Sequence, residues 1–560
     1  MPKDELSPDF AIRQVPAVDL PHPRTEDIDF LSSDQLATLL LSIQQEIFDG
    51  APTGELGLSS AEAARTAETL GREMAAVWTE TPQQSVLLAG GQMTGRLAAY
   101  LALRFNAALR VRGLPACFVA EMAGGPSAFF NPFESIELDA EAGADRWYAL
   151  KEQVSIALTI GLTDDLSTPY VCSLLDGALG EAKGRVILVG FVSPEQARSS
   201  RVLADGRSAR DFIRALERMP QGLLLSIPVG PEPIQEATRS KCGSATLALL
   251  MAAFLYGLEG RPVAATWQAL REANAQLGVQ EDTLSELIDI DGEVLKKVGS
   301  IFYMGKSGAG LMGVIDAAEC VSTFAQNPKR MRGFCLDGSA CGLESLPVFG
   351  STTALRPTLR SQVSEDALRH ILSETQVAPR LVVAVDVENK RNLALNELLR
   401  MAVHAGGYAR RVSIPVTAEA GAWLMEWSWE FAVRTLLNCF STAVHVLSGK
   451  TYSSQMIDIR MNSLGLFQEA VNIVSDLGAV GASEAKQALI TVIYRGDTDS
   501  HVPDDLASHL AAAAGRSGLV ARALLLVRGV SLEEALTLQS HEPIVRKTLA
   551  TVRDVKKSDT

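Results

Sequence analysis

The chain has 560 residues, which is too long for a single hydrophobic core, so we expect two or three domains. Its formal net charge of −15 argues against a nucleic acid or an anionic membrane as partner, because both are themselves negatively charged. The longest apolar run, Ala245–Gly257, is too short to cross a bilayer and predicts a buried helix. The acidic N-terminus has no apolar signal segment, so a cytoplasmic protein is expected.

Cysteine and histidine usage indicates neither a disulfide framework nor a metal site. The seven cysteines are scattered, odd in number and without a CxxC motif, which predicts reduced, buried thiols. The seven histidines show no HExxH motif and no paired ligand spacing. The loop Gly305–Gly310 lacks the G-x-G-x-x-G spacing of a dinucleotide site. No metal and no cofactor is therefore predicted.

The first half of the chain predicts an arm, two helices and then alternating strands and helices. Residues 1–35 are rich in Pro, Asp and Ser and predict an extended arm. Helices are predicted to begin near Ser33 and near Ser59, where Ser59 and Glu62 have capping-box spacing. Four apolar runs then predict strands: Ser85–Ala89, Ser155–Ile160, Arg185–Phe191 and Gly222–Ile227. Because these runs are apolar throughout, they indicate a parallel sheet covered on both faces.

The second half repeats this plan and ends in helices. Three further strands are predicted, at Ser300–Met304, Leu381–Val387 and Arg411–Ile414. The residues SIPV occur in each half after an apolar strand, at Ser226–Val229 and Ser413–Val416. We therefore predict an α/β fold with two doubly wound parallel-sheet domains. Beyond Lys450 four helices predict a helical cap: Met461–Leu477, Ser483–Tyr494, Pro503–Val527 and Ser531–Leu538.

Two distant segments share one strand–loop–helix pattern. They are Ser85–Leu97 (SVLLAGGQMTGRL) and Ser300–Met312 (SIFYMGKSGAGLM). A helix that begins directly after a strand presents backbone N–H groups at the positive end of its dipole, which favours a phosphate. The pattern predicts a duplicated phosphosugar-binding unit, although such a loop alone can also be an ordinary tight turn. In the first copy, Thr94 adds a hydroxyl to the backbone amides.

A second loop of the first half follows the strand Ser155–Ile160. This loop, Gly161–Pro169, carries three hydroxyl side chains, those of Thr163, Ser167 and Thr168. Loops at the carboxyl ends of parallel strands meet at a ligand crevice, so these hydroxyls are expected near the first loop. Asp164 and Asp165 in the same loop argue against a phosphate, because carboxylates repel it.

Two other clusters admit both a functional and a structural interpretation. The stretch after Gly230 brings Thr238, Arg239, Lys241 and Ser244 to a helix start, where they form either a binding site or an ordinary cap with solvated cations. The carboxylates of the segment 134–139 suggest acid–base chemistry, but a solvated acidic face is the simpler interpretation.

The motifs, taken together, resemble those of known sugar isomerase (SIS) domain proteins. Five motifs of the first half resemble the first SIS domain of glucokinase regulatory proteins and that of N-acetylmuramic acid 6-phosphate etherases. They are GGQMTGRL, EMAGG, ESIELD, GLTDDLSTPYV and VGPEPIQEATRSKCGSAT. GKSGAGLMGVIDAAECVSTFAQNPKRMRGF resembles the second SIS domain of the regulatory proteins, and LLNCFSTAVHVLSGKTYSSQMIDIRMNSLGLF the continuation into their helical lid. The resemblance covers about residues 60–550, and the length favours the regulatory proteins, because the etherases have one SIS domain per chain.

The resemblance implies a domain division and a set of sugar-phosphate contacts. The expected parts are an arm and helix at 1–58, a first SIS domain at 59–275, a second at 276–450 and a helical lid at 451–560. Thr94, Thr163 and Ser167 would offer hydroxyls to the phosphate, and Glu137 would lie beside the sugar. Lys450 would reach the phosphate from the lid. The full set of implied binding residues is Gly91, Thr94, Glu137, Thr163, Ser167, Thr168, Ser244 and Lys450.

Departures from the etherase pattern bear on catalysis. The etherases use two glutamates, and at one of the two positions this chain has Arg104. An arginine stays protonated and cannot act as a carboxylic acid. Losing one of two acid–base groups typically costs about 10²–10⁴-fold in rate. The segment Asp316–Glu319 resembles the etherases' catalytic segment, but the regulatory proteins keep similar residues there, so a structural role is predicted for Glu319.

We therefore predict a phosphosugar-binding regulatory protein that does not transform its ligand. The ligand would be a sugar 6-phosphate such as fructose 6-phosphate or N-acetylmuramic acid 6-phosphate, and the partner a sugar kinase. One alternative is an etherase-type carbon–oxygen lyase of amino sugar catabolism, with Glu137 as the catalytic base. Another is a scaffold whose sites have decayed, which a net negative crevice in the first domain would favour.

Overall fold

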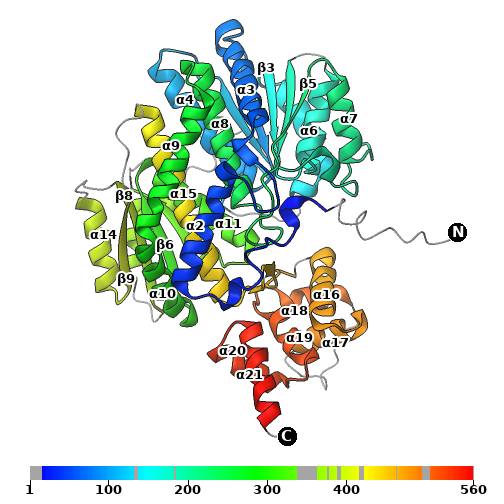
Figure 1. Cartoon of the computed structure of the whole chain (residues 1–560), viewed down its shortest axis with the longest axis vertical. Coiled ribbons are helices and arrows are strands. Elements are labelled where there is room, and N and C mark those ends of the chain that lie inside the picture. The colour runs from blue at the N-terminus through cyan, green and yellow to red at the C-terminus, as the bar shows by residue number, and fades with distance from the viewer. Residues whose placement is uncertain are drawn as a thin grey trace, which may run out of the picture.

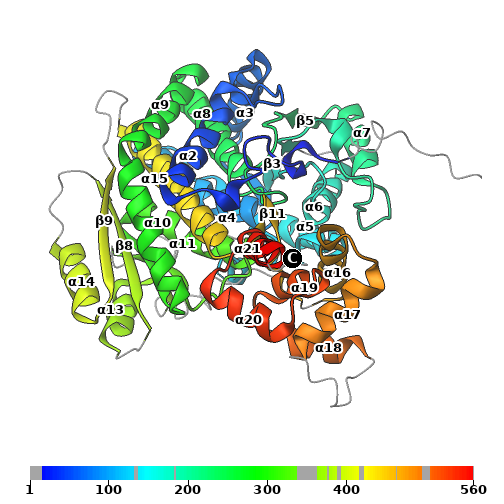
Figure 2. The ribbon, with the colours of Figure 1, turned by 60° about the horizontal axis from the view of Figure 1, so that its bottom comes forward.

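The computed structural model describes residues 15–130, 136–181, 184–336, 362–374, 378–387, 393–414, 422–461, 463–494 and 505–558. It contains two parallel β-sheets, each with helices packed on it, and a helical C-terminal domain (Figure 1). Figure 2 shows the helical domain, in orange and red, at the lower right, with the second sheet at the left of the view. The predicted fold class is confirmed.

The first sheet is parallel, with the strand order β2–β1–β3–β4–β5. The sheet is covered on one face by α3, α4 and α8 and on the other by α6 and α7 (Figure 1). Its strands are β1 (Ser85–Gly90), β2 (Phe118–Met122), β3 (Ile156–Leu162), β4 (Arg185–Gly190) and β5 (Gly222–Ser226). Its helices are α3 (Ala61–Glu80), α4 (Met93–Val111), α5 (Ala140–Lys151), α6 (Pro169–Gly180), α7 (Ala209–Arg218) and α8 (Lys241–Glu259).

The second sheet repeats this topology with the order β7–β6–β8–β9. Its strands are β6 (Ser300–Gly305), β7 (Met331–Cys335), β8 (Arg380–Val387) and β9 (Tyr408–Ile414). The helices around it are α10 (Glu281–Lys296), α11 (Ser307–Thr323), α13 (Glu365–Ser373), α14 (Leu393–His404) and α15 (Ala422–Leu447). In each half the first strand pairs with the second on one side and the third on the other, so the predicted duplication is confirmed. Of the repeated SIPV residues, Pro415 and Val416 lie outside the described residues.

Two strands were absent from the sequence prediction, β2 and β7, the second strand of each half. Each is only five residues long and contains a charged side chain, Glu121 in β2 and Arg332 in β7. Glu121 is buried because Arg146 pairs with it at 3.0 Å and Tyr170 donates a hydrogen bond to it at 2.8 Å. A search for wholly apolar runs therefore misses these strands.

A layer of helices joins the two sheets. It consists of α2 (Ser33–Asp49), α8, α9 (Val263–Ala275), α10 and α15, which pack on one another. One hydrophobic cluster runs through this layer and takes in strands of both sheets. Helix α8 is long and apolar enough to cross a membrane, but 78% of its apolar window is buried inside the fold, as predicted for a core helix. The domain division at residue 275 stays a proposal.

The C-terminal domain has its own hydrophobic cluster. The hairpin β10 (Thr451–Tyr452) and β11 (Gln455–Met456) leads into it. Its helices are α16 (Leu464–Gly478), α17 (Ala482–Ile493), α18 (Leu506–Ala513), α19 (Leu519–Val527), α20 (Leu532–His541) and α21 (Val545–Ser558). The single helix predicted over Pro503–Val527 is wrong, because Gly515 and Gly518, both with a φ of +70°, separate α18 from α19.

Several local predictions are corrected. The hydroxyl that caps α3 is that of Ser60, which accepts a hydrogen bond from the Ala63 N–H at 3.0 Å, rather than that of Ser59. Cys335 is disulfide-bonded, against the prediction of reduced thiols, whereas five other cysteines are buried free thiols: Cys117, Cys172, Cys242, Cys320 and Cys439. The predicted arm is not simply extended, since short 3₁₀ turns form at Ala17–Asp19 and Ile28–Phe30.

Candidate functional site

The first predicted phosphate loop joins β1 to α4. The Gly91 N–H donates to Thr94 Oγ1 at 2.9 Å, which holds the turn. The Gln92 N–H, at the start of the helix, donates to Glu137 Oε2 at 3.1 Å. The carboxylate lies so close over the loop that a Cβ at Gly91 would be 2.7 Å from Oε2. The positive end of the α4 dipole is thus occupied by a side chain of the protein itself.

The second predicted loop joins β3 to α6 and sends its hydroxyls in different directions. The Thr163 hydroxyl donates to the Val189 carbonyl at 2.8 Å and is consumed in the sheet. Ser167 is 1% exposed, and its Oγ has no hydrogen-bond partner among the described residues. Thr168 is the residue before α6, whose first residue is Pro169.

These loops border two adjoining cavities of about 210 and 190 Å³, which we call the crevice. Both cavities are lined by Glu137, Asp164, Thr168, Glu236 and Thr238. The first is also lined by Thr94, Arg239 and Glu319, and by Met456 from the β10–β11 hairpin. The second is also lined by Ser167, Asp19, Asp165, Arg198 and Arg201. Four predicted binding residues therefore meet in the crevice, Thr94, Glu137, Ser167 and Thr168, with Gly91 directly beneath the Glu137 carboxylate.

The other predicted binding residues have partners elsewhere. Thr163 bonds to strand β4, as described above. The Ser244 hydroxyl donates to Gln44 Oε1 at 2.9 Å in the interior between α8 and α2. Lys450 Nζ forms an ion pair with Asp458. None of the three is among the residues that line the crevice in the described structure.

The crevice carries more acidic than basic side chains. Six carboxylates and three arginines line it in the described structure. Arg198 bridges two of the acids, contacting Asp165 at 2.8 Å and pairing with Asp19. Burial and, to a lesser extent, the neighbouring Asp164 raise the pKa of Glu137 to about 7. Burial likewise raises the pKa of Asp19 to about 7 and that of Asp164 above its usual range.

The clustered carboxylates of the segment 134–139 have separate roles. Glu137 lines the crevice, whereas Asp139 caps α5 by accepting a hydrogen bond from the Ala142 N–H at 2.9 Å. Glu134 lies outside the described residues. The structural interpretation therefore holds for Asp139.

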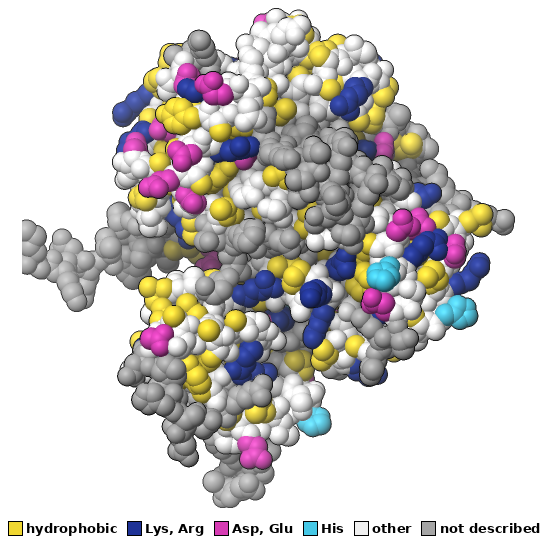
Figure 3. Space-filling model, turned by 180° about the vertical axis from the view of Figure 1, so that it is seen from behind, with side chains coloured by type: hydrophobic (Ala, Val, Ile, Leu, Met, Phe, Trp, Pro, Cys, Tyr) yellow, Lys and Arg dark blue, Asp and Glu magenta, His cyan; other side chains and the backbone are white. Residues whose placement is uncertain are grey.

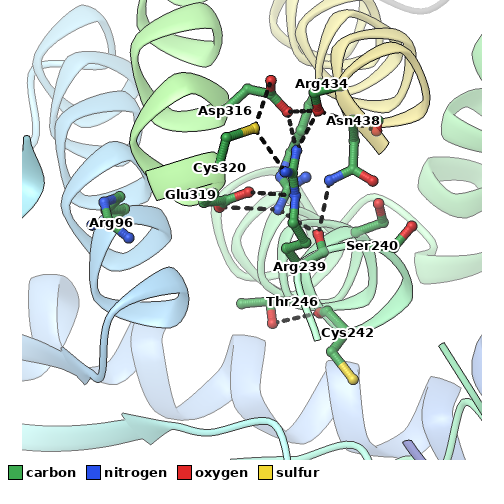
Figure 4. A network of polar contacts seen from close by, with 12 residues as sticks. Arg96, Arg239, Ser240, Cys242, Thr246, Asp316, Glu319, Cys320, Arg434 and Asn438 are labelled. Atoms are coloured by element: carbon green, nitrogen blue, oxygen red, sulfur yellow. Dashed lines mark hydrogen bonds and ion pairs between the residues drawn. The ribbon is translucent and has the colours of Figure 1, made fainter. Parts of the chain in front are cut away.

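A buried ion network forms one wall of the crevice (Figure 4). Arg239, just before α8, pairs with Asp316 of α11 and donates to Ser441 of α15 at 2.7 Å. Glu319, one turn after Asp316, lies 3.6 Å from Arg239 and 3.4 Å from Arg434. These ionised groups are at most 3% exposed, so the network joins both halves of the chain through desolvated ion pairs.

The carboxylate pattern differs from what the sequence indicated. Arg104 lies between α4 and α15, where it pairs with Glu426 at 2.5 Å and Glu430 at 3.0 Å, and it is not among the residues that line the crevice. Glu319, predicted to be structural, does line the crevice, so the second half supplies a carboxylate beside Glu137. Asp19 and Arg198 carried no sequence signal, because their meeting depends on the folded path of residues 15–31.

A third cavity, of about 360 Å³, lies against α11 and β7. It is lined by apolar side chains and by the cations Lys329 and Arg332, with no carboxylate among its described lining residues. Figure 3 shows Lys and Arg side chains gathered near the junction of the helical domain with the rest of the molecule. None of the predicted binding residues lines this cavity, so the crevice is the candidate site.

The fold and the crevice define a class of protein, one with two parallel α/β domains in tandem and a helical lid that contributes to a polar crevice. Two family models match the chain. The model described as the glucokinase regulatory protein N-terminal SIS domain matches residues 69–179, and the model described as the C-terminal lid domain of glucokinase regulatory protein matches residues 453–549.

Individual relatives agree with the family models. The glucokinase regulatory protein of Xenopus laevis is 24% identical, over 96% of this chain and 92% of its own length. The human protein is 22% identical, over 89% and 84%. An N-acetylmuramic acid 6-phosphate etherase of Crocosphaera subtropica is 27% identical, over 37% of this chain and 69% of its own length. Among solved structures, tagatose-6-phosphate ketose/aldose isomerase of Escherichia coli matches with a TM-score of 0.43 and 10% identity, over 76% of this chain and 97% of that one.

The chain thus resembles glucokinase regulatory proteins over nearly its whole length, and N-acetylmuramic acid 6-phosphate etherases over 37% of it. The predicted resemblance is confirmed.

Proposed function

We propose that this protein is a phosphosugar-binding regulator that takes a sugar 6-phosphate into the crevice and controls a sugar kinase. The observation that carries the proposal is the convergence of the α4 N-terminus with the hydroxyls of Thr94, Ser167 and Thr168 around one crevice. Helix N-termini and hydroxyls together suit a phosphate, and the regulatory relatives align over nearly the whole chain. Fructose 6-phosphate and N-acetylmuramic acid 6-phosphate are the proposed ligands.

The lid offers a route from ligand to partner. Met456 of the β10–β11 hairpin lines the crevice, so a bound sugar phosphate lies against the lid. The same hairpin also contacts the N-terminal segment, because the Ser453 N–H donates to Asp29 at 3.0 Å. A kinase that binds the lid would therefore bind a surface whose position responds to the ligand. An assay of glucose phosphorylation, with the chain and the sugar phosphate added separately and together, tests this control.

Replacing Thr94 with valine is expected to raise the Kd for fructose 6-phosphate by about 10- to 150-fold. The Thr94 oxygen already accepts the Gly91 N–H, so its own proton is free for a phosphate oxygen, and a hydrogen bond to a charged group contributes about 1.5–3 kcal/mol. Calorimetry measures the change, with Thr79→Val on the exposed end of α3 as the matched control. If neither proposed sugar phosphate binds the unaltered protein at millimolar concentration, the proposed function is wrong.

A second candidate function, an etherase-type lyase, is favoured by one observation. Glu137 and Glu319 line the same cavity, so two carboxylates are available although Arg104 is not one of them. With a pKa of about 7, Glu137 can take up or release a proton near neutral pH. The lyase would need one carboxylate to accept a proton and the other to donate one to the leaving lactate.

Lactate release separates the lyase from the regulator. The lyase predicts lactate from N-acetylmuramic acid 6-phosphate, at a rate that Glu137→Gln lowers about 10²–10⁴-fold. The regulator predicts that the same compound binds and is recovered intact. A coupled lactate dehydrogenase assay on the purified chain measures the difference.

A further inference from the structure

An internal carboxylate lies at the N-terminus of the helix after the first strand in both halves of the chain. In the first half, Glu137 Oε2 accepts the Gln92 N–H at 3.1 Å, where α4 begins. In the second half, the carboxylate of Glu430 lies in the first turn of α11, because a Cβ at Gly308 would be only 1.7 Å from its Oε1. Both carboxylates sit where the helix dipole would favour a bound phosphate.

The two carboxylates are held very differently. Glu430 is fully buried, pairs with Arg104 at 3.0 Å and accepts a hydrogen bond from the Tyr100 hydroxyl at 2.5 Å. Glu137 is only partly buried, lines both cavities of the crevice and makes no ion pair within the described part of the chain. Removing Glu430 from its place would break a desolvated ion pair, whereas moving Glu137 would cost only one backbone hydrogen bond.

We propose that Glu137 is a displaceable internal anion, so that a phosphate monoester binds at the α4 N-terminus by taking its place, while Glu430 permanently fills the corresponding place at α11. The inference rests on the proposed function and adds to it a stoichiometry of one phosphate per chain. Arg104 then has a role, which is to hold the Glu430 carboxylate at the N-terminus of α11.

An independent observation favours a ligand in the crevice, beside Glu137. The Ser167 Oγ is buried in the wall of the same crevice and has no hydrogen-bond partner among the described residues. A buried hydroxyl without a partner is unfavourable, and a ligand oxygen in the crevice would supply the missing hydrogen bond.

Displacing a carboxylate by an anion couples binding to protons. Charged groups from six elements face Glu137: Asp19 of the N-terminal segment, Arg96 of α4, Asp164 and Asp165 before α6, Arg198 and Arg201 after β4, Glu236 and Arg239 before α8, and Glu319 of α11. Because the protein desolvates the Glu137 carboxyl and acids dominate around it, its pKa is raised to about 7. The neutral carboxyl below that pH no longer competes with an anion, so binding strengthens as the pH falls.

Sulfate is the probe of choice, because its charge does not change between pH 6 and pH 8. We expect Glu137→Gln to bind sulfate about tenfold more tightly than the unaltered protein at pH 8, and about equally at pH 6, as a competing group with a pKa near 7 requires. Glu141→Gln, which removes the same charge on the exposed side of α5, is the matched control and should change neither value. Calorimetry at both pH values measures the four ratios, and fructose 6-phosphate should bind once per chain.

The outcomes test the displaceable anion, the proposed function and the closure by Glu430 separately. If Glu137→Gln binds sulfate no better than the unaltered protein at pH 8 while fructose 6-phosphate still binds, the displaceable anion is wrong and the proposed function stands. If the sulfate ratio is as expected but no sugar phosphate binds, the displaceable anion stands and the proposed function fails. Two sugar phosphates per chain would overturn the permanent closure by Glu430.

Discussion

Replacing Arg239 with methionine is expected to lower the free energy of unfolding by about 3–5 kcal/mol, because it leaves buried carboxylates without their cation. Asp316 loses its ion pair and Glu319 keeps only Arg434. The pKa of Asp316 is already raised to about 6 by burial and is held down by Arg239. Without the guanidinium the pKa of Asp316 rises further. A group with a raised pKa favours the folded state while it is protonated, and this stability is lost as the pH rises through that pKa. The loss in free energy of unfolding should therefore be larger at pH 8 than at pH 6. Urea unfolding at both pH values measures it.

Two further variants make the Arg239 result specific. Arg207→Met makes the same substitution at an arginine whose ion pairs, with Asp176 and Asp205, are exposed to solvent. It should lower the free energy of unfolding by only about 0–1 kcal/mol. Adding Asp316→Leu to Arg239→Met removes one uncompensated charge and should recover part of the loss. A deficit for Arg239→Met no greater than that of Arg207→Met would show that the network contributes little.

Replacing Arg546 with methionine is expected to release the lid from the N-terminal segment, at a cost of about 2–4 kcal/mol. Arg546 Nη1 contacts Asp29 at 2.8 Å, and its guanidinium lies 4.6 Å from the Phe30 ring centroid. Asp29 is fully buried, and burial raises its pKa, so the loss of Arg546 leaves its carboxylate with the Ser453 N–H as its remaining partner among the described residues. Hydrogen exchange should speed up in residues 17–31 and in the β10–β11 hairpin.

The control for Arg546 lies in the same domain. Arg528 is exposed on the lid and donates to the Leu477 carbonyl at 2.8 Å, without an ion pair in the described structure. Arg528→Met should leave exchange in both segments unchanged. Equal exchange for Arg546→Met and Arg528→Met would mean that the lid is held by its other contacts, such as that of Gln235 with Ser454.

The predicted strands are those that contain a continuous apolar run. In β1 and β4 the runs Val86–Gly90 and Val186–Gly190 are buried at every position, so their composition alone marks them. The two missed strands each contain a charge that tertiary contacts satisfy, as Arg146 and Tyr170 do for Glu121. The helical lid was predicted from its helical pattern, and only its breaks at Gly515 and Gly518 and its last helix were missed.

The candidate site was predictable where it depends on topology. Because the carboxyl ends of parallel strands meet at one edge, loop residues such as Thr94 and Ser167 were expected together and line the same crevice. The directions of single side chains were not predictable. Thr163 points to the Val189 carbonyl and Ser244 to Gln44, partners that lie far along the chain and are chosen by packing.

The sequence by itself determined that this protein is a duplication with two similar strand–loop–helix units and a helical lid, because those features rest on local composition and spacing. Only the tertiary structure decided which charged groups lie at each loop. The carboxylate at α11 comes from Glu430 on a helix 122 residues after Gly308 and is locked by Arg104 from the other half. Charge and burial at each loop are set by such distant partners, so two loops that are alike in sequence become one open crevice and one closed turn.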